Sequence, residues 1–373
     1  MRAAVRAHLE FTAAVQEHLG GSGNVVWSPF SVASALALAT RGAGGVTRDE
    51  LLTLLLGDKS ANVEDLVGLL GKAEDVGASH NPGAQQPEIA VANTLWTDKR
   101  VQAKRDFTKA LRSMPSGAVR SAPFEDDPDA AREMINRDVA RTTHDLIEEL
   151  LPPGVIKKDT VAALVNALYL KVAWRTKFIE EATEPQDFHT PTGTRQVPMM
   201  AVQGKADAFG YGRIPGWQAV QIRTAGKADA YVLLPDAELP AVNAATLAAL
   251  LESTDKTPVN LYLPKLRLRL QAELSKVLDR LGAGTMFTND ADLTGISEDP
   301  PLAVQAVIHE TVLKVDEQGF EGAAATAMMM RTLSVMRPPE KPVEVRVDRP
   351  FLFVVTHQDT GIVYFSAKVL DPA

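Results

Sequence analysis

Asp316-Glu-Gln-Gly-Phe-Glu-Gly-Ala-Ala-Ala-Thr-Ala327 follows a run typical of a strand, residues 310–315, and is rich in small uncharged residues. Met328-Met-Met-Arg-Thr-Leu-Ser-Val-Met336 and Arg337-Pro-Pro339 come next. A loop of this length is uncommon inside a compact domain and is usually functional or disordered. Disordered segments are rich in Pro, Ser and charge, whereas this one is rich in Ala and Met. Because small residues pass between two strands without steric clash, we interpret the stretch as a segment stored outside a sheet and able to enter it.

The composition is that of a large, acidic, cysteine-free protein. The chain has 373 residues, of which 45% are hydrophobic, and a formal net charge of -8. That hydrophobic content is enough for a large core, and no linker-like tract divides the chain. The negative charge argues against non-specific nucleic-acid binding, which needs a clustered basic surface. No apolar run approaches the length of a membrane span, and the zero cysteines exclude disulfides and thiolate nucleophiles.

Hydrophobic periodicity predicts helices and strands without βαβ alternation, so we expect an α+β fold class. Helices are predicted over 6–19, 31–40, 47–56, 63–70 and 273–281, and after Asp127, where Ile135, Val139, Leu146 and Leu150 form one apolar stripe. Strands are predicted over 88–96, 161–174, 259–270, 343–347, 351–355 and 362–369. The run 161–174 is rich in β-branched and aromatic residues, which favours a central strand buried on both faces.

Motifs of common active sites are absent from the sequence. His309-Glu-Thr-Val-Leu313 lacks the second His of a zinc-protease helix, and Gly42-Ala-Gly-Gly45 lacks the Lys-Ser/Thr of a phosphate-binding loop. No Gly-x-Ser-x-Gly elbow occurs, and the seven His residues sit at no metal-ligand spacing. We therefore expect no catalytic residue, no metal and no cofactor, and predict that the protein is not an enzyme.

Four further patches accompany the small-residue stretch: Asn24-Val-Val-Trp-Ser-Pro-Phe-Ser31; Leu164-Val-Asn-Ala-Leu-Tyr-Leu-Lys171 with Trp174; Phe188-His189 with Val197-Pro-Met-Met200; and Arg349-Pro-Phe-Leu-Phe353. Together, and in this order, the five resemble the serpins, the serine-protease-inhibitor family, and specifically an inhibitory, prokaryotic-looking member. The resemblance runs from roughly residue 5 to the C-terminus. It implies a single serpin domain over residues 1–373, with a large mainly antiparallel sheet, smaller sheets, about nine helices and an exposed reactive-centre loop at about 317–341.

The resemblance places the reactive bond between Leu333 and Ser334, fourteen residues after Gly319. Leu333 would then fill the specificity pocket of a chymotrypsin-like serine protease, whereas a cut at Arg331 would indicate a trypsin-like one. The protease would hold Leu333 as an acyl ester while the loop inserts into the main sheet as a strand. The protein would thus be an irreversible suicide-substrate inhibitor; the alternative is a non-inhibitory serpin acting as a binding or chaperone protein.

The hinge of this loop is identified, by the same resemblance, with Glu317, Gly319, Phe320, Glu321, Gly322, Ala323, Ala324, Ala325 and Thr326. In an inserted strand successive side chains alternate between faces. Phe320, Gly322, Ala324, Thr326 and Met328 share the face expected to become buried. The family usually has a small residue at the position of Phe320, the first to enter, so a phenyl ring needs a large hole at the top of the sheet.

Two clusters beneath and beside the moving strands are also implied by the resemblance. The cluster that the family calls the shutter matches Ser28, Ser31, Asn166 and His309, and buried polar groups there must bond to one another. The breach, where insertion begins, matches Trp174, Lys265 and Glu317, with a partly buried Lys265–Glu317 pair.

The helix after Asp127 departs from the family pattern. Asp138 stands where that pattern has a Trp, and Thr143-His144 stands where it has Gly-Lys. Because this helix must move aside during insertion, we expect its docking to differ in this chain.

The expected partner is a serine protease, with no nucleic acid and no membrane. A monomer is expected, with loop–sheet polymers on destabilisation. The N-terminus, Met1-Arg-Ala-Ala-Val-Arg6, shows no apolar region before a cleavage site and hence no signal peptide. The sequence alone therefore predicts a cytoplasmic protein, whereas the resemblance implies an extracellular one.

Overall fold

The computed structural model describes residues 3–19, 21–79, 86–112, 117–298, 302–320 and 341–372. The predicted reactive bond Leu333–Ser334, the alternative cut at Arg331 and the hinge residues 321–326 lie outside these described residues. Glu317, Gly319 and Phe320 of the hinge lie within them, as do all the residues of the two predicted polar clusters.

A six-stranded sheet carries the start of the hinge. Its strand order is β12 (Leu266–Glu273), β13 (Ile308–Val315), β14 (Gly319–Phe320), β4 (Ala162–Ala173), β2 (Glu88–Thr97) and β3 (Gly117–Ser121). All neighbours are antiparallel except the edge pair of β2 and β3. The predicted central strand over 161–174 is β4, and its direct neighbour from the hinge is the two-residue strand β14.

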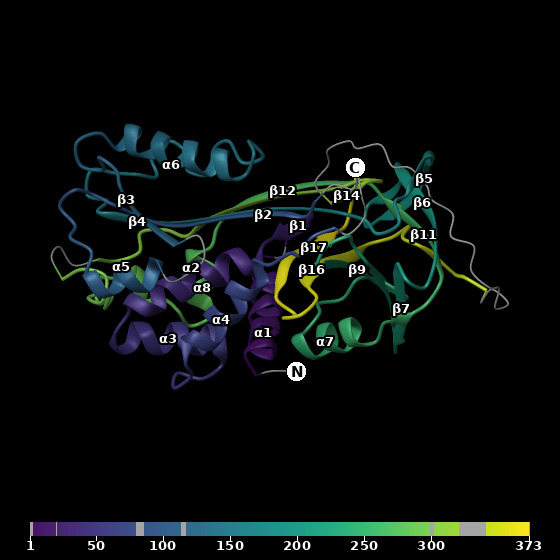
Figure 1. The fold of residues 1–373 in the computed structure, drawn as a ribbon, viewed down its shortest axis with the longest axis horizontal. Coiled ribbons are helices and arrows are strands. Elements are labelled where there is room, and N and C mark those ends of the chain that lie inside the picture. Colours follow the sequence, from purple (N-terminus) through teal and green to yellow (C-terminus); the bar gives the residue numbers. More distant parts are fainter. Residues whose placement is uncertain are drawn as a thin grey trace.

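In Figure 1 the seven-stranded sheet lies below the right-hand half of the six-stranded sheet, and the four-stranded sheet lies at its right-hand end. The seven-stranded sheet has the order β1 (Val25–Trp27), β17 (Val363–Val369), β16 (Phe351–His357), β9 (Ala228–Pro235), β8 (Trp217–Ile222), β7 (Phe209–Ile214) and β10 (Asp255–Lys256). The four-stranded sheet has the order β15 (Val343–Arg346), β11 (Val259–Pro264), β6 (Gly193–Gly204) and β5 (Ile179–Thr190).

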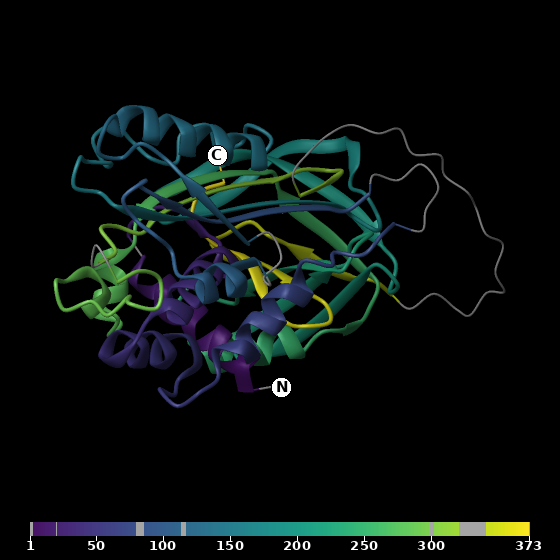
Figure 2. The ribbon, with the colours of Figure 1, turned by 60° about the vertical axis from the view of Figure 1, so that its left-hand side comes forward.

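The described residues form eight α-helices and one short 3-10 helix. They are α1 (Ala3–His18), α2 (Pro29–Gly42), α3 (Gly45–Leu56), α4 (Val63–Ala73), α5 (Arg105–Arg112), α6 (Pro128–Thr142), α7 (Ala244–Glu252), α8 (Ser275–Arg280) and η1 (Thr285–Phe287). Helix α6 lies across one face of the six-stranded sheet, and α2, α3, α4 and α8 lie on the opposite side (Figures 1 and 2). None of the helices described is long and apolar enough to cross a membrane.

Each face of the six-stranded sheet has its own apolar core. Leu168, Leu170 and Val172 of β4 point into the main core, which also contains the buried face of α2. Val165 and Ala167 point the other way, into a smaller cluster with Ile135 and Val139 of α6. Successive residues of a strand point to opposite faces, so the long apolar run of β4 is explained by burial on both sides, as predicted.

The helix after Asp127 is shorter than the sequence predicts. It begins as expected, with the Asp127 carboxylate accepting from Ala130 N at 3.0 Å and Pro128 in the first turn. It ends at Thr142, however, so that Leu146 and Leu150 of the predicted apolar stripe lie beyond it. His144 and Asp145 have φ values of 49° and 61°, which are incompatible with a right-handed helix.

The predicted strand over 259–270 is two strands in different sheets. Strand β11 pairs with β6, and β12 pairs with β13, so the chain passes from one sheet to another at Lys265. The apolar residues change from odd positions (259, 261 and 263) to even positions (266, 268 and 270) at this crossing, so the phase of the alternation marks the boundary that the single predicted strand overlooked. Strands β5 to β9, which belong to two different sheets, were not predicted either. Of these, β5 is largely exposed and shows no clean alternation.

Candidate functional site

The first residues of the hinge form part of the six-stranded sheet. Phe320 is paired with Val315 on one side and with Val172 on the other, and Gly319 is opposite Ala173. The preceding turn is closed by the Asp316 carboxylate, which accepts from Gln318 N at 2.8 Å and Gly319 N at 3.2 Å. The expectation that the chain rests outside the sheet directly after Val315 is therefore wrong for these two residues.

Gly319 is required by a close approach of two backbones. A β-carbon at this position would lie 2.2 Å from the carbonyl oxygen of Val172, far inside van der Waals contact. Any other residue would push β14 away from β4. The glycine therefore allows the hinge to enter the sheet at this point.

Phe320 fills the hole that the sequence led us to expect at the top of the sheet. Its side chain is fully buried, and its ring contacts that of Trp174 edge-on. Trp174 is itself fixed, because its indole N–H donates to the Asp316 carbonyl at 2.8 Å. The phenyl ring therefore already lies in the sheet of the uncut chain. Phe320 is not a residue that must still enter the sheet during loop insertion.

The predicted breach residues meet beside this ring. Lys265 Nζ lies 2.8 Å from Glu317 Oε1, and the Thr183 hydroxyl donates to the same oxygen at 2.6 Å. Glu317 is buried, whereas the Lys265 side chain is 42% exposed. Burial opposes ionisation of Glu317, but the hydrogen bonds from Lys265 and Thr183 outweigh it and hold the pKa of Glu317 below its usual value. Thr183 was not predicted, because it lies on β5, a strand without a sequence signal.

The four predicted shutter residues also lie together in one hydrogen-bonded cluster, in which the Ser31 backbone N–H donates to Ser28 Oγ at 3.1 Å. Ser28 caps α2, and its backbone N–H donates to His309 Nε2 at 3.0 Å. The Ser31 hydroxyl donates to the side-chain oxygen of Asn166. His309 is buried beside the ring of Trp27, and burial lowers its pKa to about 4, so the imidazole is neutral at pH 7.

Two polar side chains of this cluster were missed by sequence reasoning. Asn166 donates to the side chain of Asn93 on β2, which is directly opposite it in the sheet. The Thr311 hydroxyl lies 2.8 Å from His309 Nε2. A buried Asn at an inward position of a predicted strand is a usable signal for Asn93, but its pairing with Asn166 requires the register of β2 and β4.

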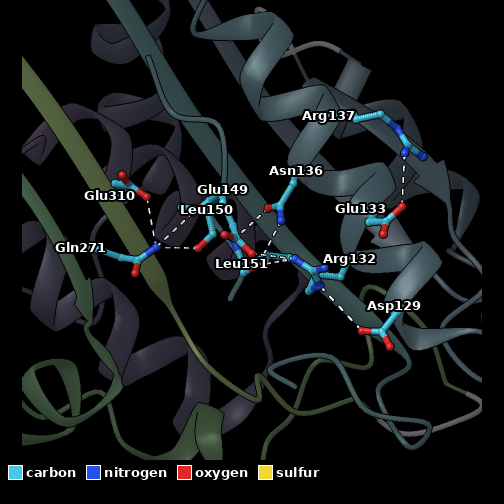
Figure 3. A network of polar contacts seen from close by, with 10 residues as sticks. All are labelled: Asp129, Arg132, Glu133, Asn136, Arg137, Glu149, Leu150, Leu151, Gln271 and Glu310. Carbon is cyan, nitrogen blue, oxygen red and sulfur yellow. Dashed lines mark hydrogen bonds and ion pairs between the residues drawn. The ribbon is translucent and has the colours of Figure 1, made fainter. Parts of the chain in front are cut away.

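A polar network fastens α6 and the segment after it to the sheet (Figure 3). Asn136 of α6 donates to Leu151 O at 3.0 Å and accepts from Leu151 N at 2.8 Å. Gln271 of β12 donates to the carbonyls of Glu149 and Leu150 at 3.2 and 3.1 Å, and to the Glu310 carboxylate at 3.1 Å. The segment after α6 is therefore tied both to the helix and to the strands beneath it.

Asp138, a position at which this chain departs from the family pattern, forms a second polar contact between α6 and the six-stranded sheet. Its carboxylate is buried and lies 2.5 Å from Arg120 on β3, and it also pairs with Arg141. The Arg120 guanidinium lies 5.6 Å from the ring centre of Trp96 on β2, within the range of a cation–π contact. At the end of the helix, His144 lies 3.0 Å from Glu88. Polar contacts thus take the place of an aromatic side chain between α6 and the sheet.

Comparison with known proteins assigns the chain to a family. The family model described as "Serpin (serine protease inhibitor)" matches residues 8–372. The chain is a serpin. It is 32% identical to Iris of Ixodes ricinus over 361 residues, which cover 93% of this chain and 92% of Iris. It is 29% identical to alpha-1-antiproteinase S of Cavia porcellus over 374 residues, 98% of this chain and 88% of that protein.

The architecture agrees with solved serpin structures. Uncleaved ovalbumin matches with a TM-score of 0.82 and 24% identity, over the full length of both chains. The predicted α+β serpin fold, with a large antiparallel sheet and smaller sheets, is confirmed. The two relatives named above come from eukaryotes, so the expectation of a prokaryotic-looking member receives no support.

Proposed function

We propose that this serpin is an irreversible suicide-substrate inhibitor of serine proteases, cleaved at Leu333–Ser334. One observation carries the proposal: β13 and β4 are linked through the two residues of β14. Among the strands that the structure describes, no backbone ladder joins β13 directly to β4. Strand edges with unpaired N–H and C=O groups favour the addition of another strand. The hinge continues directly from β14, so the loop is the nearest segment that can extend it.

The physical consequence of such an extension is a large displacement. Fourteen residues at a rise of about 3.3 Å per residue make a strand of roughly 46 Å. A protease bound as an acyl ester to Leu333 would be carried that distance along the sheet. Its active site would be distorted against the sheet before the ester is hydrolysed, and each inhibitor molecule would be consumed once.

The residue at the cut sets the class of protease. An apolar Leu333 suits a chymotrypsin-like pocket, where each methylene contributes about 1–3 kcal/mol to discrimination. Arg331 would instead be recognised by a trypsin-like enzyme. We favour Leu333 as the residue that enters the pocket.

We also propose that residues 1–373 act as one domain and as a monomer. In this proposal the shutter (Ser28, Ser31, Asn166 and His309) holds the strands together, and the breach (Trp174, Lys265 and Glu317) governs the entry of the loop. Loss of the His309 contacts to Ser28 and Thr311 would let the strands part early. We therefore expect His309→Ala to form loop–sheet polymers on mild heating, seen as a ladder in native electrophoresis.

The test is to mix the protein separately with chymotrypsin and with trypsin. A complex that survives denaturing electrophoresis, with release of a C-terminal peptide that begins at Ser334, would support the proposal. A peptide that begins at Thr332 would move the cut to Arg331. Clean cleavage without complex would favour the alternative of a non-inhibitory binding or chaperone protein.

A matched pair of hinge variants tests the role of insertion in the same assay. Ala324→Arg places a charge on the face that would become buried, whereas Ala325→Arg places it on the opposite face. We expect the first variant to be cleaved as a substrate with little complex. The second should retain more complex, and equal behaviour of the two would contradict insertion in this register.

A further inference from the structure

The turn that follows α6 has a strained backbone. His144 and Asp145 have φ values of 49° and 61°, in the left-handed region that is disfavoured for residues with a β-carbon. Thr143 closes the turn, because its hydroxyl donates to Val139 O at 2.9 Å and accepts from Ile147 N at 3.1 Å. Contacts of the turn with the rest of the molecule must offset the remaining strain.

The His144 side chain reaches from this turn to two strands of the six-stranded sheet. Its Nε2 atom lies 3.0 Å from Oε1 of Glu88 on β2. Its ring lies against that of Tyr169 on β4, with the centroids 4.3 Å apart and the planes at 38°. Tyr169 is on the same face of β4 as Val165 and Ala167, which pack against α6. One imidazole thus joins the end of α6 to both β2 and β4.

Charges of both signs surround this imidazole. Glu88 provides a carboxylate from β2, and Asp145 provides a second one in the same turn. Lys171 of β4 is opposite Glu88 in the β2–β4 ladder. Arg141 of α6 is paired within its own helix. The carboxylate of Glu88 is therefore the charged group in direct contact with His144.

Both contacts of His144 become stronger when the imidazole carries a proton. A hydrogen bond between two ionised groups is stronger than a neutral one, and a cation is attracted to the face of an aromatic ring. The side chains of His144 and Glu88 are 52% and 47% exposed, so protonation does not place a charge in the core. Histidine is the side chain whose charge ordinarily changes between pH 5 and 8.

We propose that His144 is a pH-sensitive clasp that holds the end of α6 on the six-stranded sheet. In its protonated form it binds Glu88 and Tyr169 firmly and offsets the strain of the turn. At alkaline pH the contact with Glu88 is a neutral hydrogen bond, and the turn opens more often. Helix α6 lies across one face of the sheet (Figure 1), so the clasp sets how readily that face is uncovered. It acts in the uncut protein and is independent of the proposed inhibition.

The clasp responds to pH in the opposite direction to the buried histidines. His309 and His8 are held neutral in the core, where burial lowers the pKa of each to about 4. Acid therefore destabilises the fold at these two residues. At the half-exposed His144, acid instead adds a charge that the neighbouring carboxylate stabilises. The end of α6 is thus held more tightly by this residue under conditions in which the whole fold is less stable.

Two substitutions of His144 separate its charge from its hydrogen bond. His144→Gln keeps a donor but is never charged, whereas His144→Arg is charged at every pH used. The readout is amide hydrogen exchange of the segment 146–151 in the uncut protein. Variants are compared with the wild type at the same pH, so that the intrinsic exchange rate cancels.

The expected result is an effect of His144→Gln in acid alone. At pH 5.5 the segment should exchange about three- to fivefold faster in His144→Gln than in the wild type. At pH 8.0 the two should agree within about twofold, because the wild-type imidazole is then neutral. His144→Arg should exchange about threefold more slowly than the wild type at pH 8.0, because it stays charged.

Three further variants serve as controls. Glu88→Gln removes the charge of the partner and should accelerate exchange at pH 5.5 as His144→Gln does, with no further gain in the double variant. His18→Gln is the matched control, because His18 is exposed on α1, where its ring contacts the Ala14 carbonyl. It should leave the segment unchanged at both pH values. The melting temperature of each variant at pH 8.0 verifies that it folds.

The remaining outcomes overturn the clasp. Equal acceleration by His144→Gln at both pH values means that the imidazole acts only by packing against Tyr169. A full effect of His144→Gln in the Glu88→Gln background means that this carboxylate is not the partner. If His144→Arg and His144→Gln exchange alike at pH 8.0, then a charge at this position does not hold the turn.

Discussion

The rings of Phe320 and Trp174 meet edge-on, with centroids 5.6 Å apart and planes at 65°. The start of the hinge is therefore anchored in the sheet by an apolar contact, and the Phe320 side chain is fully buried there. Truncation of a buried Phe costs about 3–5 kcal/mol through lost burial and the cavity that remains. We expect Phe320→Ala to lower the free energy of unfolding of the uncut chain by about this amount, as measured by urea denaturation.

Ile179→Ala provides the matched control for this prediction. Ile179 is also a large apolar residue of this end of the molecule, but it is 49% exposed. Its truncation should change the unfolding free energy by less than about 1 kcal/mol. If Phe320→Ala costs no more than Ile179→Ala, then Phe320 is not packed against Trp174 in solution.

The ion pair between Lys265 and the buried Glu317 carboxylate leads to a prediction about the free energy of unfolding. Removing one partner of a fully buried pair costs about 3–5 kcal/mol, because the other charge is left uncompensated. Lys265 is partly exposed, so we expect a smaller loss of about 2 kcal/mol for Lys265→Met. The control is Lys59→Met, whose partner Asp49 lies 3.8 Å away and is exposed like Lys59 itself. A loss no larger than in that control would contradict the prediction.

The pH dependence of this contribution follows from the lowered pKa of Glu317. The unfolded state binds a proton at its ordinary pKa of about 4.3, above that of the folded state. The stabilisation is therefore present at neutral pH and is lost as the pH falls through the folded pKa. Urea denaturation of the wild type and Glu317→Gln should show stabilities that converge at low pH. Parallel curves would contradict the assignment.

The titration of His309 makes the stability of the fold depend on pH in a higher range than the titration of Glu317 does. Its folded pKa is about 4, whereas an unfolded His titrates near 6.5. The unfolded state therefore takes up a proton first, and stability is lost as the pH falls from about 6.5 towards 4. Between pH 7.5 and 5.0 the loss from one such residue is about 2 kcal/mol.

The variant His309→Gln isolates this contribution. It should be less stable than the wild type at pH 7.5, because its contacts to Ser28 and Thr311 are lost. Its stability should nevertheless fall by about 2 kcal/mol less between pH 7.5 and 5.0. His8 is also buried with a pKa of about 4, so His8→Gln should flatten the profile similarly. An unchanged profile in His309→Gln would refute the prediction.

The residues of the two clusters could be found from the sequence because each lies in a local motif. Ser28 and Ser31 flank a helix start, and Asn166 interrupts an apolar strand. Their partners could not be found in the same way. Asn93 reaches its cluster through strand pairing, whose register depends on contacts between segments far apart in the chain. Thr183 contacts Glu317 from an irregular stretch of β5, whereas Thr311 lies two residues from His309 on the same strand.

The sequence also could not predict that Gly319 and Phe320 already lie in the sheet of the uncut chain. Period-two alternation predicts which face Phe320 occupies once it is in a sheet, but it does not say how many residues are already there. That depends on a hole beside Trp174 of the right shape and on the close approach of Gly319 to Val172. Both are properties of packing between segments separated by well over a hundred residues.

The last prediction concerns Gln271 of β12, which helps to hold the segment after α6 against the strands beneath it. Its side-chain amide is shared among the Glu149 and Leu150 carbonyls and the Glu310 carboxylate. The Glu310 side chain is fully buried and also accepts from Arg269 at 2.7 Å. Gln271→Met keeps the length of the side chain but removes the donor. A lost hydrogen bond of this kind costs about 0.5–1.5 kcal/mol, or up to about tenfold in a local opening equilibrium.

We therefore expect amides of the segment after α6, around 147–156, to exchange several-fold faster in Gln271→Met of the uncut protein. Hydrogen exchange read by mass spectrometry measures this directly. The control is Gln358→Met, which removes comparable bonds to Gly226 and Asp229 at the far sheet and should leave the segment unchanged. If amides of the segment exchange equally fast in the two variants, then the contact of α6 through Asn136 and Leu151 is sufficient to hold the segment in place.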